Sequence, residues 1–147
     1  MLSLLNRKAI NRFFYYWLPV FFWMGLIFWL SSFHKLEVSQ ISWQDFIFRK
    51  AAHFSEYTLL FLLYYRAFKN SLIKTDKYKL VYLSLFLAIL YSMSDEYHQT
   101  FVSGRSGRLF DVTVDSLGSL FGAFLVTEIS PLLPGRWRKL FEKLKII

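Results

Sequence analysis

The chain has 147 residues, of which 55% are hydrophobic and 21% aromatic, and its net charge is +8. A soluble domain of this length has too much surface for its volume to bury so many apolar side chains, so the composition favours a membrane protein. The absence of cysteine excludes a disulfide framework and a thiolate metal site or nucleophile. Anionic lipid headgroups explain the positive charge better than nucleic acid does, and no nucleic-acid partner is expected.

Four apolar segments predict membrane-spanning helices. Residues 13–33 are uncharged and long enough for a bilayer core, which needs about 20 residues. Basic residues precede this segment, but no small-x-small cleavage site follows it, which indicates an uncleaved span with Pro19 near its start. Three weaker segments complete an all-α bundle of four transmembrane helices in one domain covering residues 1–147; they are residues 51–65, 80–94 and 112–133.

The basic residues predict how this multi-pass cell-membrane protein is oriented. Thirteen of the eighteen Lys and Arg residues fall in residues 1–12, 66–79 and 136–147, which four spans place on one side. Because cytoplasmic segments are enriched in Lys and Arg, both termini should be cytoplasmic. The loops at residues 33–49 and 95–111 should then face outward. The final stretch "PGRWRKLFEKLKII" is basic and amphipathic, and is expected to lie on the inner headgroup surface.

Polar residues gather at the outer ends of the last three predicted spans. Helical spacing places Lys50, His53 and Tyr57 on one stripe. The residues expected to converge there are Lys50, His53, Glu56 and Tyr57 of the second span, Asp95, Glu96, His98 and Gln99 of the third, and Asp111 and Asp115 of the fourth. Gly118 and Gly122 then form a small-xxx-small pair, which lets another helix approach closely.

The segment "VSGRSGR" between the third and fourth spans predicts an anion-binding turn. Gly104 and Gly107 can adopt positive φ, so the backbone can turn sharply and aim its N–H groups at one point. Arg105 and Arg108 add forked donors that suit phosphate or carboxylate. The fourth helix begins soon afterwards, and a helix N-terminus also favours an anion.

Other readings of the same residues stay open. Four bases and five acids could form an ion-pair network that only ties helix ends together, although buried ion pairs stabilise poorly; they are Arg49, Lys50, Arg105 and Arg108 with Glu56, Asp95, Glu96, Asp111 and Asp115. Several of these carboxylates, together with His53 and His98, could ligate a cation. Their spacing matches no standard metal motif, and no metal is predicted. A triad of Ser55, His53 and Asp111 lacks a nucleophile elbow.

Two segments resemble the signature of the VanZ-like family. These are "RKAAHFSEYTLLFLL" and "SDEYHQTFVSGRSGRLFDVTVDSLGSLFG", within residues 49–66 and 94–122. The family pattern is K-x-x-H-x-x-x-Y, then D-E-x-x-Q-x-F-x-x-x-R, then two aspartates and G-x-x-x-G. It falls here on Lys50, His53 and Tyr57, then Asp95, Glu96, Gln99, Phe101 and Arg105, then Asp111, Asp115, Gly118 and Gly122. Ser103 stands where many members have proline.

The resemblance implies a membrane protein of the bacterial cell envelope, in a family named for a protein that gives low-level resistance to the glycopeptide teicoplanin. It does not supply an activity or a cofactor, so two hypotheses remain. In the first, a membrane enzyme acts on an anionic lipid or lipid-linked envelope precursor. Its phosphate-holding residues would be Lys50, Arg105 and Arg108, its proton carriers His53, Glu56, Asp95 and Glu96, and its other substrate contacts Tyr57, His98, Gln99, Asp111 and Asp115. In the second, the same residues bind an envelope lipid, glycan or drug without turnover.

Overall fold

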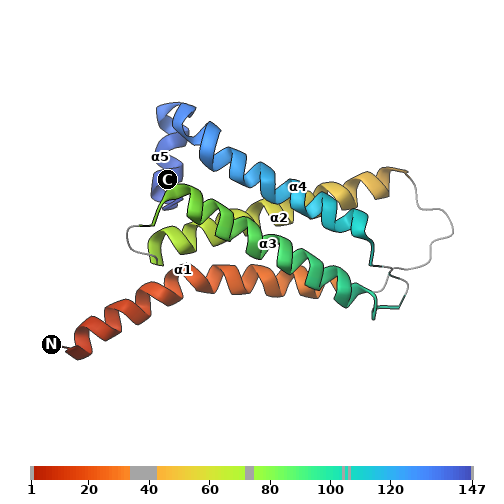
Figure 1. Ribbon diagram of the computed structural model, residues 1–147, viewed down its shortest axis with the longest axis horizontal. Coiled ribbons are helices and arrows are strands. Elements are labelled where there is room, and N and C mark those ends of the chain that lie inside the picture. Colours follow the sequence, from red (N-terminus) through yellow and green to blue (C-terminus); the bar gives the residue numbers. More distant parts are fainter. Residues whose placement is uncertain (1, 34–42, 72–74, 104, 106, 147) are drawn as a thin grey trace.

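The computed structural model describes residues 2–33, 43–71, 75–103, 105 and 107–146, and this part of the chain is helical without a strand. Four long helices run in alternating directions, so that both termini lie at the same end of the bundle (Figure 1). They are α1 (Leu2–Ser31), α2 (Trp43–Ser71), α3 (Lys77–Gln99) and α4 (Leu109–Phe124). A π-helical turn (η1, Leu125–Ile129), a 3-10 turn (η2, Ser130–Leu132) and the short helix α5 (Gly135–Lys143) follow.

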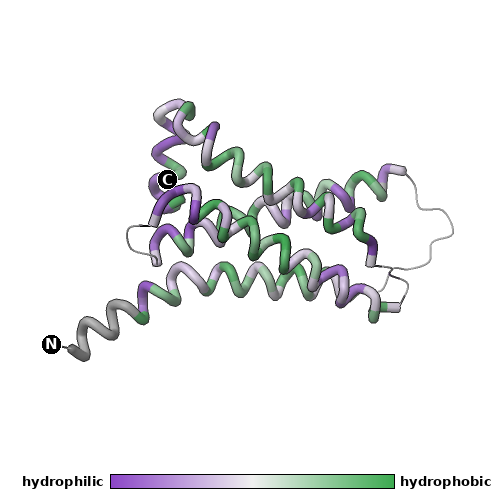
Figure 2. Tube along the Cα trace, in the orientation of Figure 1, coloured by the Kyte–Doolittle hydropathy of each residue, from purple (hydrophilic) through white to green (hydrophobic). Residues whose placement is uncertain are grey.

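The first three predicted spans each fall on one long helix, and the fourth, at residues 112–133, covers α4, η1 and η2. Two segments in the described part of the chain are long and apolar enough to cross a bilayer, Ile10–Ser31 and Leu109–Leu132. The all-α prediction is therefore confirmed, and two of the four predicted spans have the length and composition of a membrane-crossing helix. Figure 2 shows mostly apolar residues along the middle of the helices and hydrophilic residues towards their ends.

Two helices extend beyond the predicted apolar segments, although the candidate span Ile10–Ser31 agrees with the predicted span at residues 13–33. The first helix begins at Leu2 rather than near residue 13, so Pro19 lies in its interior. Because proline lacks an N–H and its ring crowds the preceding turn, it bends a helix, and α1 is visibly bent in Figure 1. The predicted outer loop at residues 33–49 is shorter, since α2 already begins at Trp43. Hydropathy missed both extensions because the added turns contain charged and amide side chains.

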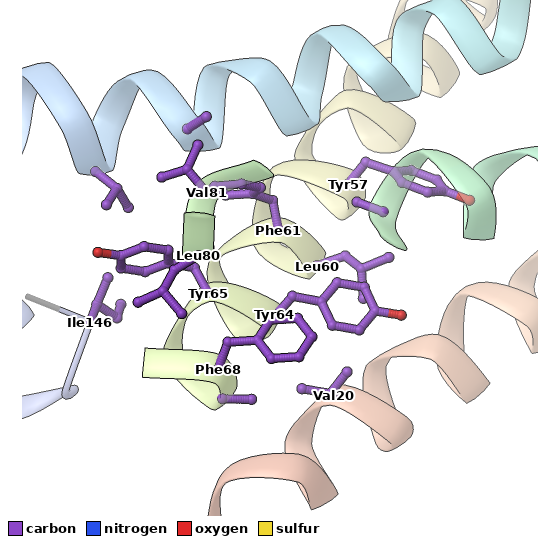
Figure 3. Close-up of a cluster of buried hydrophobic side chains, with 14 of the residues drawn as sticks. Val20, Tyr57, Leu60, Phe61, Tyr64, Tyr65, Phe68, Leu80, Val81 and Ile146 are labelled. Atoms are coloured by element: carbon purple, nitrogen blue, oxygen red, sulfur yellow. The ribbon is translucent and has the colours of Figure 1, made fainter. Parts of the chain in front are cut away.

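The centre of the bundle is α2. It contacts α1, α3 and α4, whereas α1 and α4 do not touch each other within the described residues. Its buried side chains recur at helical spacing, including Tyr57, Phe61 and Tyr64. Figure 3 shows these residues packed with Val20 of α1 and Val81 of α3. The burial of one continuous face of α2 fixes the depth at which its polar first turns meet the other helices.

Glycines on α4 let its backbone come into direct contact with the backbone and side chains of α2. A Cβ at Gly118 would lie 2.3 Å from the carbonyl oxygen of Phe54, and one at Gly122 would lie 2.7 Å from the ring of Phe61. Thr58 Oγ1 donates a hydrogen bond of 2.9 Å to the carbonyl oxygen of Gly118. The predicted close-packing role of this glycine pair is confirmed.

The outward faces of the helices are strongly apolar. On α1, Phe22 is 70% exposed, and on α3 Phe86 is 59% exposed. Further exposed apolar side chains continue these faces, among them Leu18 on α1, Leu90 on α3 and Leu117 on α4. Contiguous apolar surface of this kind needs lipid or another apolar partner to cover it.

Candidate functional site

The polar site lies at the end of the bundle opposite the two termini, where α2 and α4 begin and α1 and α3 end (Figure 1). A cavity of about 100 Å³ opens there; its lining residues are Phe46, Arg49, Lys50, His53, Gln99, Arg105, Arg108 and Asp111. A second cavity of about 180 Å³ is lined by Ile27, Leu30, Ser31, Arg49, Ala52, His53, Glu56 and Arg105. We call them the first and second cavities. They share Arg49, His53 and Arg105.

Lys50 is held at the wall of the first cavity by charge and by aromatic rings. Its Nζ forms an ion pair with Asp111 of α4. The same Nζ lies 5.3 Å from the ring centroid of Phe46 and 5.6 Å from that of Phe110, within the range of cation–π attraction. The second turn of α2 is thereby fixed to the first turn of α4.

A second link joins α2, α3 and α4 deeper in the bundle. His53 Nδ1 lies 3.2 Å from Asp115 Oδ1, and Ser92 Oγ donates a hydrogen bond of 2.7 Å to Asp115 Oδ2. Asp115 is fully buried. A buried carboxylate is tolerated only where hydrogen-bond donors or charges surround it, and Ser92 and His53 supply them here.

Asp95 begins a chain of contacts that reaches α1. It accepts hydrogen bonds from Ser31 Oγ (2.7 Å) and from Gln99 Nε2 (3.0 Å). Arg105 donates to Gln99 Oε1 at 3.2 Å and to two carbonyl oxygens at the end of α1, those of Leu30 (3.3 Å) and Phe33 (3.1 Å). Arg105 therefore supplies donors to carbonyls at the end of α1, where Leu30 otherwise accepts, within the described residues, only a long bond of 3.4 Å from the N–H of Phe33.

Glu96 occupies the place where an external anion was expected. Its Oε2 accepts a hydrogen bond of 2.9 Å from the backbone N–H of Arg108, the residue that precedes α4. The N-terminus of α4 is thus capped by a carboxylate of the chain itself. Gly107 does not use the positive φ that a glycine allows. Glycine is required there because a Cβ would lie 2.3 Å from the carbonyl oxygen of Glu96. Gly104 lies outside the described residues.

Other predicted site residues lie away from the cavity walls. Tyr57 is fully buried in the core, and its hydroxyl has no hydrogen-bond partner in the described part of the chain. The His98 ring lies on the Phe28 ring, with 4.1 Å between the centroids, and its Nδ1 is buried without a partner among the described residues. Neither side chain lines either cavity.

The structure places four of the five acids away from the wall of the first cavity. The first cavity has four basic side chains on its wall and a single carboxylate, that of Asp111. Asp95, Glu96 and Asp115 are buried between the helices and line neither cavity, while Glu56 lines the second. The near balance of charge counted in the sequence therefore does not describe the cavity wall, which is strongly basic.

Three contributors were missed as site residues. Arg49 lines both cavities. The sequence could have predicted this, because Arg49 lies one helical turn before His53 and therefore on the same face of the helix. Ser31 donates a hydrogen bond to Asp95, and Ser92 donates one to Asp115. No sequence pattern predicts either contact. A serine in an apolar helix often bonds only its own backbone, as Ser84 does to the carbonyl oxygen of Leu80.

The sequence profile of the VanZ/LLP1 family matches residues 4–130, which is most of the chain and includes every residue of the polar site. The chain belongs to the VanZ/LLP1 family. No significant match was found among curated proteins or among solved structures. As a VanZ/LLP1 protein it is a membrane protein, and Ile10–Ser31 and Leu109–Leu132 are its two candidate spans.

Proposed function

We propose that this VanZ/LLP1 protein is a four-span protein of the bacterial cell envelope that binds the phosphate of an anionic lipid or lipid-linked envelope precursor. The observation that carries this proposal is the wall of the first cavity, where four basic side chains face one carboxylate. Phosphate oxygens are matched by forked guanidinium donors and by ammonium groups. The cavity is large enough for a headgroup phosphate and too small for a whole lipid, whose tails would stay in the bilayer.

Arg49 is the strongest candidate for direct contact with the anion. Its side chain is exposed, lies where both cavities meet and has no hydrogen-bond or ion-pair partner in the described part of the chain. Lys50 and Arg105, in contrast, are already held by Asp111 and by the end of α1. They supply fixed positive charge, whereas Arg49 can turn towards a ligand.

The four-span arrangement is supported by where polar side chains lie on α3. Its carboxylates Asp95 and Glu96 are buried against the other helices, and its outward face carries Phe86, Leu90 and Met93. Polar residues are tolerated at membrane depth when they face protein rather than lipid. A helix with this distribution can cross a bilayer even though its mean hydropathy is moderate.

The orientation follows from the basic residues and can be tested because the chain has no cysteine. We expect a cysteine replacing Ser103, at the polar end, to react in intact cells with a maleimide that cannot cross the membrane. A cysteine replacing Leu144, at the opposite end, should react only after permeabilisation. The reverse pattern would place the cavity on the cytoplasmic side and remove an outward-facing role.

Arg49→Gln is expected to weaken binding of a polyprenyl phosphate about tenfold, because a hydrogen bond to a charged group contributes about 1.5–3 kcal/mol. The thermal midpoint of the purified protein should not change, since Arg49 has no partner in the described structure. Binding is measured on detergent-solubilised protein, with the corresponding polyprenol, which lacks phosphate, as the ligand control.

Arg136→Gln is the matched protein control, because Arg136 is an exposed arginine at the other end of the bundle. It should leave polyprenyl phosphate binding unchanged. If Arg49→Gln and Arg136→Gln bind the phosphate equally well, or if the polyprenol binds as tightly as its phosphate, the first cavity is not an anion site.

A non-catalytic accessory role is the second candidate. Asp95 and Glu96, two of the proposed proton carriers, line neither cavity, so only His53 and Glu56 of that group reach one. Comparing the lipids of cells with and without the protein separates the two roles. A new or missing lipid species supports turnover, and unchanged lipids with altered teicoplanin binding support the accessory role.

A further inference from the structure

Three side chains with metal-binding chemistry meet between the helices. His53 of α2, Glu96 of α3 and Asp115 of α4 each offer one ligand atom, and these atoms all lie within 4.8 Å of one another. His53 Nδ1 lies 3.2 Å from Asp115 Oδ1. Two ligands bound to one Zn²⁺ at tetrahedral angles are about 3.4 Å apart, given metal–ligand bonds of about 2.0–2.2 Å.

Glu96 gives a separate indication that a ligand belongs there. It is 5% exposed, and one of its oxygens is bound to the N–H of Arg108. The other, Oε1, is buried and accepts no hydrogen bond within the described residues. A buried carboxylate oxygen without a donor is costly, and a bound cation would remove that cost.

We propose that His53, Glu96 and Asp115 bind a divalent transition-metal cation, with Zn²⁺ and Mn²⁺ as the ions to test. One imidazole and two carboxylates are a usual ligand set for these ions, and the two carboxylate charges balance a charge of +2. The sequence showed no metal motif because each ligand comes from a different helix. Such a site joins α2, α3 and α4 at a single point.

The position of this ion connects it with the cavities. His53 is both a metal ligand in this proposal and a lining residue of both cavities. The cation would therefore lie against the cavity wall and add to its attraction for a phosphate oxygen. This last step rests on the proposed function, whereas binding of the metal to its three ligands does not.

The test uses full-length protein in detergent, with any affinity tag removed, treated with a chelator and then equilibrated with Zn²⁺ or Mn²⁺. After gel filtration, elemental analysis should find about one metal ion per chain for at least one of the two ions. Glu96→Gln and Asp115→Asn should each raise the dissociation constant at least tenfold. The thermal midpoint of the native protein should rise on adding the metal.

Glu128→Gln is the matched control, because Glu128 is an exposed carboxylate on η1, at the other end of the bundle, and is outside the three-residue cluster. It should bind the metal as the native protein does. Absence of stoichiometric metal in the native protein overturns the proposal even if the variants fold poorly. Unchanged affinity in Glu96→Gln also overturns it. Polyprenyl phosphate binding is measured separately on metal-free protein, so failure of the metal site and failure of the anion site are distinguishable.

Discussion

Gly118→Ala is expected to lower the thermal midpoint of the purified protein by roughly 10 °C. The added methyl group would lie 2.3 Å from the carbonyl oxygen of Phe54, and a backbone atom cannot rotate away as a side chain can. Overpacking of this kind costs about 1–3 kcal/mol, and a domain of this size loses about 2–4 °C per kcal/mol. We place this site at the upper end of the range because α2 and α4 must separate. Intrinsic tryptophan fluorescence in detergent measures the midpoint.

Gly25→Ala is the control for this prediction. Gly25 lies within α1, and a Cβ there would have nothing within 4 Å. Since alanine favours the helix more than glycine does, the thermal midpoint of the Gly25→Ala variant should equal that of the native protein or be slightly higher. Equal midpoints for Gly118→Ala and Gly25→Ala would mean that the close approach of α4 to α2 contributes little to stability.

Arg105→Gln is expected to destabilise the protein by about 3 kcal/mol and to free the end of α1. The variant loses hydrogen bonds from the guanidinium to the carbonyl oxygens of Leu30 and Phe33 and to the side chain of Gln99. Hydrogen bonds involving a charged group contribute about 1.5–3 kcal/mol, and partial exposure of Arg105 reduces their sum. Hydrogen–deuterium exchange should become faster at the amides of Ser32 and Phe33.

Arg49→Gln is the matched comparison for this second effect. It removes an equal charge from the same cavity walls, but Arg49 has no partner in the described structure. Its exchange rates at the end of α1 should equal those of the native protein. If both variants speed exchange to the same extent, the loss of charge rather than of the three hydrogen bonds is responsible.

The sequence predicted those features that depend on spacing along one helix. The polar stripe containing Lys50 and His53 and the packing pair Gly118 and Gly122 follow from helical periodicity alone, and both are present. Convergence of three helix ends followed from alternating span directions. Which side chains pair across helices did not follow, since Lys50 with Asp111 and His53 with Asp115 depend on the relative rotation of α2 and α4.

The roles of the carboxylates were the hardest to predict. Periodicity placed Asp95 and Glu96 at the end of a helix near the bases, and that location is correct. It could not tell that Glu96 caps α4 and that Asp95 binds Ser31, because both contacts need the three-dimensional positions of other elements. From the sequence, both carboxylates were expected to contact a ligand, whereas in the structure they mainly accept hydrogen bonds from other parts of the chain.

The unequal attachment of the helices divides the polar end into a fixed part and an adjustable part. Backbone contact at Gly118 holds α2 and α4 as one unit, and the walls of the first cavity contain no residue of α1. The second cavity, in contrast, takes Ile27, Leu30 and Ser31 from α1, which meets α2 and α3 but not α4 in the described structure. A tilt of α1 would therefore change the volume of the second cavity directly. It would reach the basic cavity only through Arg105, whose side chain is bound to the carbonyl oxygens of Leu30 and Phe33.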